Sequence, residues 1–358
     1  MNAPLCQDPG RVPGLRAFVW GKDNDAAAKA IRDTSAPFKV ILKTRNEDLL
    51  LPKWLAHYQA ILETRGSIII LDNMSDSERV FGLYRQYADE IILIRYEGIP
   101  DSAHSLKKFA ELYEAVWASS RFYALFDTDE FLTLYDGIKL LTGPKIVRYL
   151  EHNTDAALFP TLFLNNILAR EDAFIFEEHN ILQYHLMGKP ILNSRLMQEK
   201  LYTPVGHTCN LPLPLFSGKI PLGFVLFHMS HISRELRITS NLQKLRHLGL
   251  MVDETNMANL FHAELDKPEI PHIVAEYITE LRYLAGIENE EEAIRQALCR
   301  DHITVSPDGA LSFSREALKN LFANHVSAKL NLLDVLPVDA AKLRDMTATL
   351  GDALLPAL

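Results

Sequence analysis

Continuous apolar runs alternate with amphipathic segments through the first half of the chain. Runs with the length and β-prone composition of buried strands lie at 38–44, 67–71, 90–95 and 122–126. Apolar residues at helical spacing lie between these runs, at 48–62, 75–88 and 103–119. Uninterrupted apolar strands that alternate with helices predict a mostly parallel sheet flanked by helices, and so an α/β fold.

The second half has a different pattern. Residues 156–164 predict one more strand, and 181–230 are irregular and rich in Pro, Gly and His. From there the spacing is mainly helical, with helices predicted at 232–248, 252–265, 271–285, 289–300 and 314–326. A hairpin is predicted at 303–313, turning at Pro307-Asp308-Gly309. The predicted parts are an N-terminal extension at 1–36, an α/β domain at 37–235 and a mainly helical C-terminal region at 236–358.

Polar residues follow three of the predicted strands at the point where each strand ends. Arg45-Asn46-Glu47 follow the first strand, Asp72-Asn73 the second, and Asp127-Thr128-Asp129 the fourth. Ligands of parallel sheets gather at the carboxyl ends of the strands, so we expect these groups around one binding site.

Asp127 and Asp129 predict a metal site. Two carboxylates two positions apart at a strand end can turn toward one cation, and hard oxygen ligands suit Mg²⁺ or Mn²⁺. A diphosphate can complete the coordination, and the metal then neutralises a departing nucleoside diphosphate. The alternative is a solvated strand-end turn with capping carboxylates.

The candidates after the first two strands also have two interpretations. Asn46 and Glu47 can hydrogen-bond a base or a ribose, and Arg45 can face phosphate. Asp72, with Asn73 beside it, can accept from a ribose hydroxyl or a base N–H. The alternative in both places is a loop whose side chains cap the following helix.

Lysines and histidines supply further candidates. Lys107 or Lys108, on the predicted helix before the fourth strand, can reach a phosphate, although a solvated helix face explains at least one of them. His207, His228 and His231 come late in the chain. Of these, His228 is the candidate metal ligand or diphosphate contact, against a purely structural role.

Composition and charge narrow the function classes. The formal net charge is −9, with 37 basic and 46 acidic side chains, whereas nucleic-acid binders normally carry a basic field. Cys6, Cys209 and Cys299 are far apart and form no disulfide framework, which favours a reducing, cytoplasmic compartment. Neither a signal peptide nor a spanning apolar run is predicted, and contact with the inner face of the membrane stays open, as does the oligomeric state.

An ordered set of motifs resembles a known family. The set comprises Arg45-Asn46-Glu47, Trp54-Leu55-Ala56-His57-Tyr58, Leu71-Asp72-Asn73 with Ser75, Phe126-Asp127-Thr128-Asp129-Glu130-Phe131-Leu132, and the late His228-Met229-Ser230-His231. Across about residues 38–245 it is similar to the family-2-like glycosyltransferases related to family 92, the former DUF23 group. Two places depart from the family pattern: Thr44-Arg45 stands where Lys is common, and His-Met-Ser-His replaces His-Tyr.

The resemblance implies a GT-A fold and an inverting hexosyltransferase. The implied donor is a nucleotide sugar, with a UDP-sugar favoured, the implied cofactor is Mn²⁺ or Mg²⁺, and the acceptor is a saccharide or glycoconjugate in bacterial surface polysaccharide synthesis. Asp127 and Asp129 match the metal and diphosphate motif. Asn46, Glu47 and Asp72 match nucleoside-binding positions, and His228 matches the late histidine. The 37–235 domain would then be the nucleotide-sugar-binding and catalytic domain.

An inverting transfer needs a general base beside the acceptor hydroxyl. Asp172 and Glu171 are the candidates, against a solvated loop. Two other functions stay open. Phe126-Asp127-Thr128-Asp129 is similar to the nucleophile motif of haloacid-dehalogenase-type phosphatases, in which Asp127 would be the nucleophile, although that motif normally follows the first strand. The second alternative function is a non-catalytic, sugar-binding scaffold protein of the same fold.

Overall fold

A computed structural model describes residues 14–98, 103, 105, 107–156, 158–175, 189–195, 204–205, 208–209, 223–247 and 272–327. The chain divides into two compact units, which are described one at a time. The first unit takes its residues from Met1–Phe163, Glu178–Leu226 and Phe322–Leu358. The second unit takes them from Leu164–Glu177 and Phe227–Leu321.

A seven-stranded sheet forms the centre of the first unit, in the order β1-β4-β3-β2-β5-β11-β8. The first five of these are parallel, and β11 and β8 join antiparallel beside β5. In chain order the strands are β1 (Arg16–Val19), β2 (Ala36–Thr44), β3 (Ile68–Asp72), β4 (Ile91–Arg95), β5 (Ser120–Asp127), β8 (Leu158–Phe159) and β11 (Ile191–Asn193). The predicted mostly parallel α/β class is therefore confirmed.

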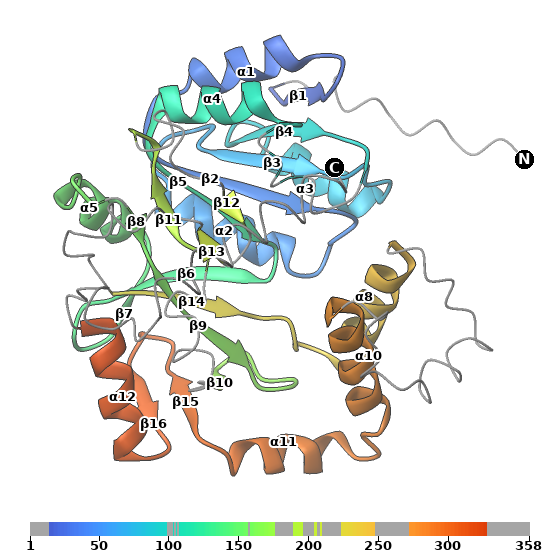
Figure 1. Ribbon diagram of the computed structural model, residues 1–358, viewed down its shortest axis with the longest axis vertical. Coiled ribbons are helices and arrows are strands. Elements are labelled where there is room, and N and C mark those ends of the chain that lie inside the picture. The colour runs from blue at the N-terminus through green and yellow to red at the C-terminus, as the bar shows by residue number, and fades with distance from the viewer. Residues whose placement is uncertain are drawn as a thin grey trace, which may run out of the picture. The chain divides into compact units, whose positions relative to one another are not determined.

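Helices cover both faces of this sheet, as the continuous apolar strands require. Alternate residues of β3 enter opposite cores: Ile68 and Ile70 one, Ile69 and Leu71 the other. The first core is closed by α2 (Leu51–Ile61) and α3 (Glu78–Gln86), and the second by α1 (Asn24–Arg32) and α4 (Ala110–Ser119). Figure 1 shows α1 and α4 together over one face of the strands.

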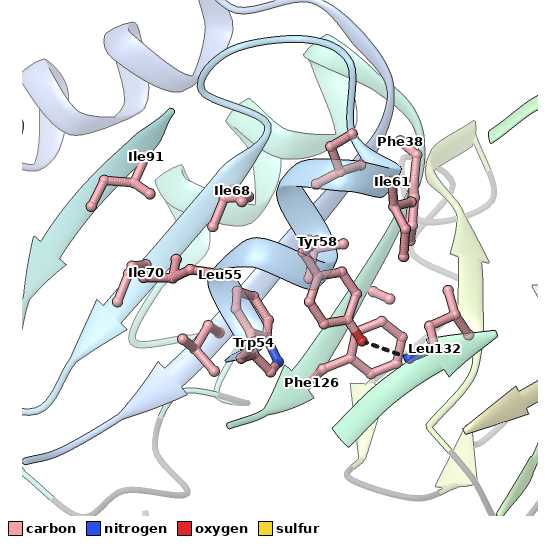
Figure 2. Close-up of a cluster of buried hydrophobic side chains, with 14 of the residues drawn as sticks. Phe38, Trp54, Leu55, Tyr58, Ile61, Ile68, Ile70, Ile91, Phe126 and Leu132 are labelled. Carbon is pink, nitrogen blue, oxygen red and sulfur yellow. Dashed lines mark hydrogen bonds between the residues drawn. The ribbon is translucent and has the colours of Figure 1, made fainter. Parts of the chain in front are cut away.

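Helix α2 connects the first core to the end of β5 and the start of β6. Trp54 and Tyr58 are fully buried, and the Tyr58 ring stacks on Phe126 of β5 at 5.6 Å between centroids. Tyr58 Oη accepts from Leu132 N at 3.2 Å (Figure 2). The same hydroxyl donates to Glu130 O at 3.1 Å. The start of β6 (Glu130–Tyr135) is thus held against α2 directly after the turn that ends β5.

The remaining elements of the first unit are short. They are β7 (Leu140–Leu141), which pairs with β6, the helix α5 (Lys145–His152), and the pair β12 (Pro204–Val205) and β13 (Thr208–Cys209). Val225 O, in β14 (Phe224–His228), accepts from Thr133 Oγ1 of β6 at 3.1 Å. Strand β14 continues along the chain into the second unit, as does β9 (Thr161–Asn166).

The second unit combines an antiparallel sheet with helices. Strand β10 (Ala173–Ile175) pairs with β9 and β15, and β15 (His302–Val305) pairs with β16 (Leu311–Phe313). Its helices are α8 (Arg234–His247), α10 (His272–Ala285) and α11 (Glu290–Leu298), and α12 (Glu316–Ser327) begins in it. Across the described residues, no helix combines the length and apolarity needed to span a membrane.

Several predicted elements differ from the observed ones. Residues 14–32, expected in an N-terminal extension, contain β1 and α1, and β1 pairs with β4. The helix predicted at 103–119 begins only at Ala110, because the preceding turn is closed by Ser105, which accepts from Lys108 N and Phe109 N. The single strand predicted at 156–164 is two strands, β8 and β9, that flank Pro160.

The C-terminal pattern was predicted well. The helices expected at 232–248, 271–285, 289–300 and 314–326 correspond to α8, α10, α11 and α12. The hairpin expected at 303–313 is β15 and β16. The helix predicted at 252–265 lies outside the described residues.

Candidate functional site

The carboxyl ends of β2, β3 and β5 lie side by side in the first unit. Strand β2 is in the middle, with Thr44 opposite Asp72 of β3 and Lys43 opposite Asp127 of β5. Thr128 Oγ1 also donates to Thr44 Oγ1 at 3.3 Å. The strand register therefore brings together the polar groups that the sequence placed at three separate strand ends.

Two lysine ammonium groups face the Asp127 carboxylate. Lys189 Nζ donates to Asp127 Oδ2 and lies 2.8 Å from Glu130 Oε2, while Lys43 Nζ lies 3.6 Å from Asp127 Oδ1. The side chains of Lys189 and Glu130 are 3% and 1% exposed, whereas that of Asp127 is 30% exposed. Burial lowers the pKa of Lys189, but Asp127 and Glu130 outweigh it, so the net pKa lies above its ordinary value and the ammonium group stays charged.

Backbone contacts hold this cluster in place. Glu130 Oε2 accepts from Asp127 N at 2.7 Å, which closes the turn between β5 and β6. Thr161 Oγ1 donates to Lys189 O at 3.0 Å, and Lys189 leads into β11, which pairs with β5. Lys189 is thus anchored through both its main chain and its side chain.

Sequence analysis assigned no role to Lys189, Lys43 or Glu130. Lys189 lies in the segment that appeared irregular, and nothing in its neighbours points to Asp127, 62 positions away. The pattern of β2 did not single out Lys43, because the same strand carries a second lysine, Lys39, whose ammonium group is buried against Ile31 O and Ser119 Oγ.

Asn46 joins the loops that follow β2 and β3. Its φ of 51° lies in the left-handed region, which asparagine tolerates better than most residues. Asn46 Oδ1 accepts from Asp76 N at 2.9 Å and Ser77 N at 3.1 Å, and Nδ2 donates to Asp76 Oδ1 at 2.8 Å. Asn46 N donates to Ser75 Oγ at 2.8 Å. Asn46 therefore caps α3 rather than the helix that follows it in sequence.

Glu47 caps that following helix. Its Oε1 accepts from Leu49 N at 2.9 Å and Leu50 N at 3.0 Å, just before α2 begins. An acidic group there also favours the positive end of the helix dipole. Arg45 is exposed in the same loop. The contacts that Asn46, Glu47 and Arg45 would make with a nucleoside diphosphate stay predictions.

Asp72 is fully buried, and its oxygens accept from protein donors. The donors are Ser75 N at 3.1 Å, Ser75 Oγ, Tyr84 Oη at 3.2 Å and Arg95 Nε at 3.1 Å. Burial and the Asp72 charge raise the pKa of Tyr84 well above its ordinary value, so its hydroxyl remains a donor. Arg95 Nη2 also donates to Ser75 O at 2.6 Å. Asp72 thus organises the loop after β3 from inside.

Asn73 and Lys108 also have internal partners. Asn73 is buried, its N donates to Thr44 O at 2.9 Å, and its Nδ2 donates to Gly98 O at 2.9 Å. Lys108 Nζ donates to Glu97 O at 2.9 Å and lies 5.2 Å from the centre of the Tyr96 ring. These contacts hold Glu97 and Gly98, which follow β4, and the predicted phosphate contact of Lys108 stays a prediction.

The donors around Asp127 do not match a prepared divalent-metal site. Asp127 Oδ2 accepts a hydrogen bond from Lys189, Lys43 Nζ lies 3.6 Å from Oδ1, and Asp129 is a partly exposed residue of the following turn. Among the residues that the structure describes, no group of three or more His, Cys, Asp or Glu side chains is arranged to hold a metal ion. A dication at Asp127 would have to displace an ammonium group or lie against two of them.

Three predicted site residues belong to the second unit. His228 Nδ1 donates to Asn165 Oδ1 at 2.8 Å, which fixes the orientation of its ring. Arg170 donates to both oxygens of Asp172 at 2.8 Å, and this hydrogen bonding lowers the pKa of Asp172. Glu171 is exposed beside it. Their roles as metal ligand and general base stay predictions.

Glu280 organises the segment that follows His228 in the second unit. From α10 it accepts from His231 Nε2 at 2.7 Å, from Arg237 Nε and Nη2 at 2.7 and 2.8 Å, and from Asn241 Nδ2 at 2.7 Å. Burial raises the pKa of Glu280, but these hydrogen bonds outweigh it and hold the pKa well below its usual range. The carboxylate therefore ties α8 to α10 and to His231.

No protein-family model matches the sequence, and no curated protein sequence matches it. Among solved structures, residues 1–349 of S. aureus TarS are 13% identical, with 78% of this chain and 97% of that chain covered and a TM-score of 0.33. The mannosyltransferase PcManGT from Pyrobaculum calidifontis, in complex with GDP-Man and Mn²⁺, is 11% identical, with 77% and 79% covered and a TM-score of 0.28.

Glucosyl-3-phosphoglycerate synthase from Mycobacterium tuberculosis, in complex with Mn²⁺, UDP and glucosyl-3-phosphoglycerate, is 12% identical. The match covers 76% of this chain and 89% of that chain, with a TM-score of 0.29. Identities and TM-scores this low do not establish an activity for this chain. Its function has to be argued from its own residues.

Proposed function

We propose that the chain transfers a sugar from a nucleoside-diphosphate donor to a hydroxyl group of a saccharide or glycoconjugate. One observation carries this proposal: the register of β2 with β3 and β5 sets Lys43 opposite Asp127 and Thr44 opposite Asp72. The adjoining strand ends therefore carry a charged cluster around Asp127. Beside it lie the loops after β2 and β3, which are hydrogen-bonded to each other. Parallel sheets bind ligands at this edge.

The two halves of a nucleotide suit the two sides of β2. On the β5 side, Lys43 offers an ammonium group near the surface, the kind of group that forms charge-assisted hydrogen bonds with a diphosphate. On the β3 side, the loops at Asn46 and Ser75 are joined by hydrogen bonds and provide a fixed surface for the base and ribose. Asp72, being buried, would shape this surface through Ser75.

For the general base, exposure and the hydrogen bonds of Asp172 favour Glu171 over Asp172. A base works best when its pKa lies near the working pH, and the hydrogen bonds from Arg170 lower the pKa of Asp172. Glu171 is exposed, so an acceptor hydroxyl can reach it. An inverting transfer with Glu171 as base is therefore the proposed mechanism.

The finer assignments belong to the same proposal. They are a GT-A-type catalytic domain at 37–235, a UDP-sugar as the favoured donor, and a cytoplasmic role in bacterial surface polysaccharide synthesis. They are supported by the ordered motifs from Arg45 to His231. His228 is proposed to contact the donor diphosphate.

Ligand binding and turnover test this proposal together. The full chain would be mixed with UDP, GDP, ADP and CDP, each with EDTA or with Mn²⁺, and its thermal unfolding followed. A strong response to one nucleotide, with release of that nucleotide from its sugar donor, is the expected result. Phosphate release from p-nitrophenyl phosphate that is lost in Asp127→Asn would indicate the phosphatase instead. If no nucleotide changes the unfolding temperature, the non-catalytic sugar-binding scaffold becomes the favoured function.

A further inference from the structure

We infer that Lys189 and Lys43 are the resident cations of the donor site, so that the diphosphate binds without a divalent metal ion. This inference rests on the proposed function, because it concerns how the same donor is held. The sequence motif predicts that the positive charge facing the diphosphate comes from a metal ion at Asp127. In the structure, Lys189 Nζ donates to Asp127 Oδ2, and Lys43 Nζ forms a longer ion pair, 3.6 Å from Oδ1.

The position of Lys189 is built into the fold. Its ammonium group is 3% exposed and contacts two carboxylates, Asp127 and Glu130, of which Glu130 is 1% exposed. The main chain is held by Thr161, and the Glu130 carboxylate by Asp127 N. An ammonium group this buried is stable only with anionic partners, and removing it would leave Glu130 as an uncompensated buried charge.

The ion pairs around Asp127 join two carboxylates to two ammonium groups. Asp127 and Glu130 are countered by Lys189 and Lys43. A donor diphosphate therefore does not meet two uncompensated carboxylates, which is the repulsion that a bound dication would otherwise remove. Lys189 acts as a positioning residue, since it neutralises the carboxylates from inside.

Lys43 is the member of the pair that a ligand can reach. Its side chain is 17% exposed, against 3% for Lys189, and it belongs to β2, between the nucleoside side and the Asp127 side of the edge. We therefore assign the direct diphosphate contact to Lys43. Lys189→Met should change how binding depends on metal, while Lys43→Met should weaken binding with or without metal.

Calorimetric titration tests this assignment with the nucleoside diphosphate that the full chain binds best, in EDTA and then in Mn²⁺. For the unmodified chain, the Kd should agree within about threefold between the two conditions, less than the loss of one charge-assisted hydrogen bond. Lys189→Met should bind about tenfold more weakly in EDTA and recover in Mn²⁺, because Asp127 and Glu130 are then open to a dication. Lys189→Arg should behave as the unmodified chain, and Lys145→Met, at the exposed start of α5, is the control.

Each other outcome decides a separate point. If EDTA abolishes binding by the unmodified chain while Mn²⁺ restores it, the inference is overturned and the proposed function stands. If no nucleoside diphosphate binds in either condition, both fail. If the Lys189→Met variant does not fold, the double variant Lys189→Met/Glu130→Gln is used instead, because it removes both members of the buried ion pair. The effect of EDTA on the unmodified chain decides the inference even without either variant.

Discussion

Asn46 and Asp76 are joined by two hydrogen bonds across the ends of neighbouring strands. Asn46 Nδ2 donates to Asp76 Oδ1 at 2.8 Å, and Asp76 N donates back to Asn46 Oδ1 at 2.9 Å. The pair connects the loop after β2 to the start of α3, 30 positions later in the chain. A side chain in one loop thereby sets the shape of the other.

Asn46→Ala should destabilise the first unit by about 1–3 kcal/mol, because it removes the cap of α3 and strains a left-handed backbone position. Urea unfolding gives the loss in free energy, and KM for the donor should rise with it. Asn46→Gly is the matched control. Because glycine accepts the same φ, the loss of unfolding free energy in this variant measures the side-chain hydrogen bonds without the backbone strain. A variant as stable as the unmodified chain would contradict the capping role.

Asp72→Asn should be much more damaging, at about 3–5 kcal/mol, because it leaves Arg95 without its carboxylate in a buried setting. The reason is structural, so the loss should appear in unfolding experiments without any ligand. Asp33→Asn, at the exposed C-terminal end of α1, should change stability little. Equal effects of the two substitutions would show that Asp72 is not the internal anchor.

His57 should make the chain sensitive to mild acid. Its ring Nε2 donates to Leu132 O at 2.8 Å, and burial lowers its pKa from 6.5 to about 4. Between pH 6.5 and about 4 the unfolded chain takes up a proton that the folded chain does not, so stability falls as pH falls, by up to about 1.4 kcal/mol per pH unit. Urea unfolding at a series of pH values measures this slope. His57→Gln should flatten it, and an unchanged slope would rule out His57 as its source.

Asp127→Asn should abolish most turnover while the chain stays folded. The carboxylate is 30% exposed, so its loss costs little burial, but Lys43 then lacks its carboxylate partner and Lys189 keeps only Glu130. A fall of about a hundredfold in kcat, the size seen when one group is removed from a preorganised charged site, is expected with near-normal circular dichroism. Turnover close to that of the unmodified chain would count against the site.

Local pattern determined much of the fold. In β3, Ile68–Asp72, every residue is buried, and consecutive side chains enter different cores, which is why a short run without polar interruption predicted a strand covered on both faces. Helix α2 was predictable for a similar reason: Trp54, Leu55 and Tyr58 share one face, and Pro52 lies in the first turn, where its missing N–H costs nothing.

Other boundaries depended on contacts that sequence spacing does not contain. The helix predicted from 103 starts at Ala110, since Ser105 closes a turn first. The strand predicted across Pro160 divides there, and its halves pair in different sheets. Residues 1–36, rich in Pro, Gly, Asp and Ala, predict an extension, yet within them β1 forms the edge of the sheet beside β4.

The α/β class and the order of the polar strand ends can be predicted from the residue pattern, because both follow from residues that are neighbours along the chain. The groups that meet at Asp127 depend on the tertiary fold. Lys189 reaches it from 62 positions away through the pairing of β11 with β5, and Lys43 reaches it through the register of β2. Charge compensation acts over a few ångströms in space, and separation along the sequence does not reveal it.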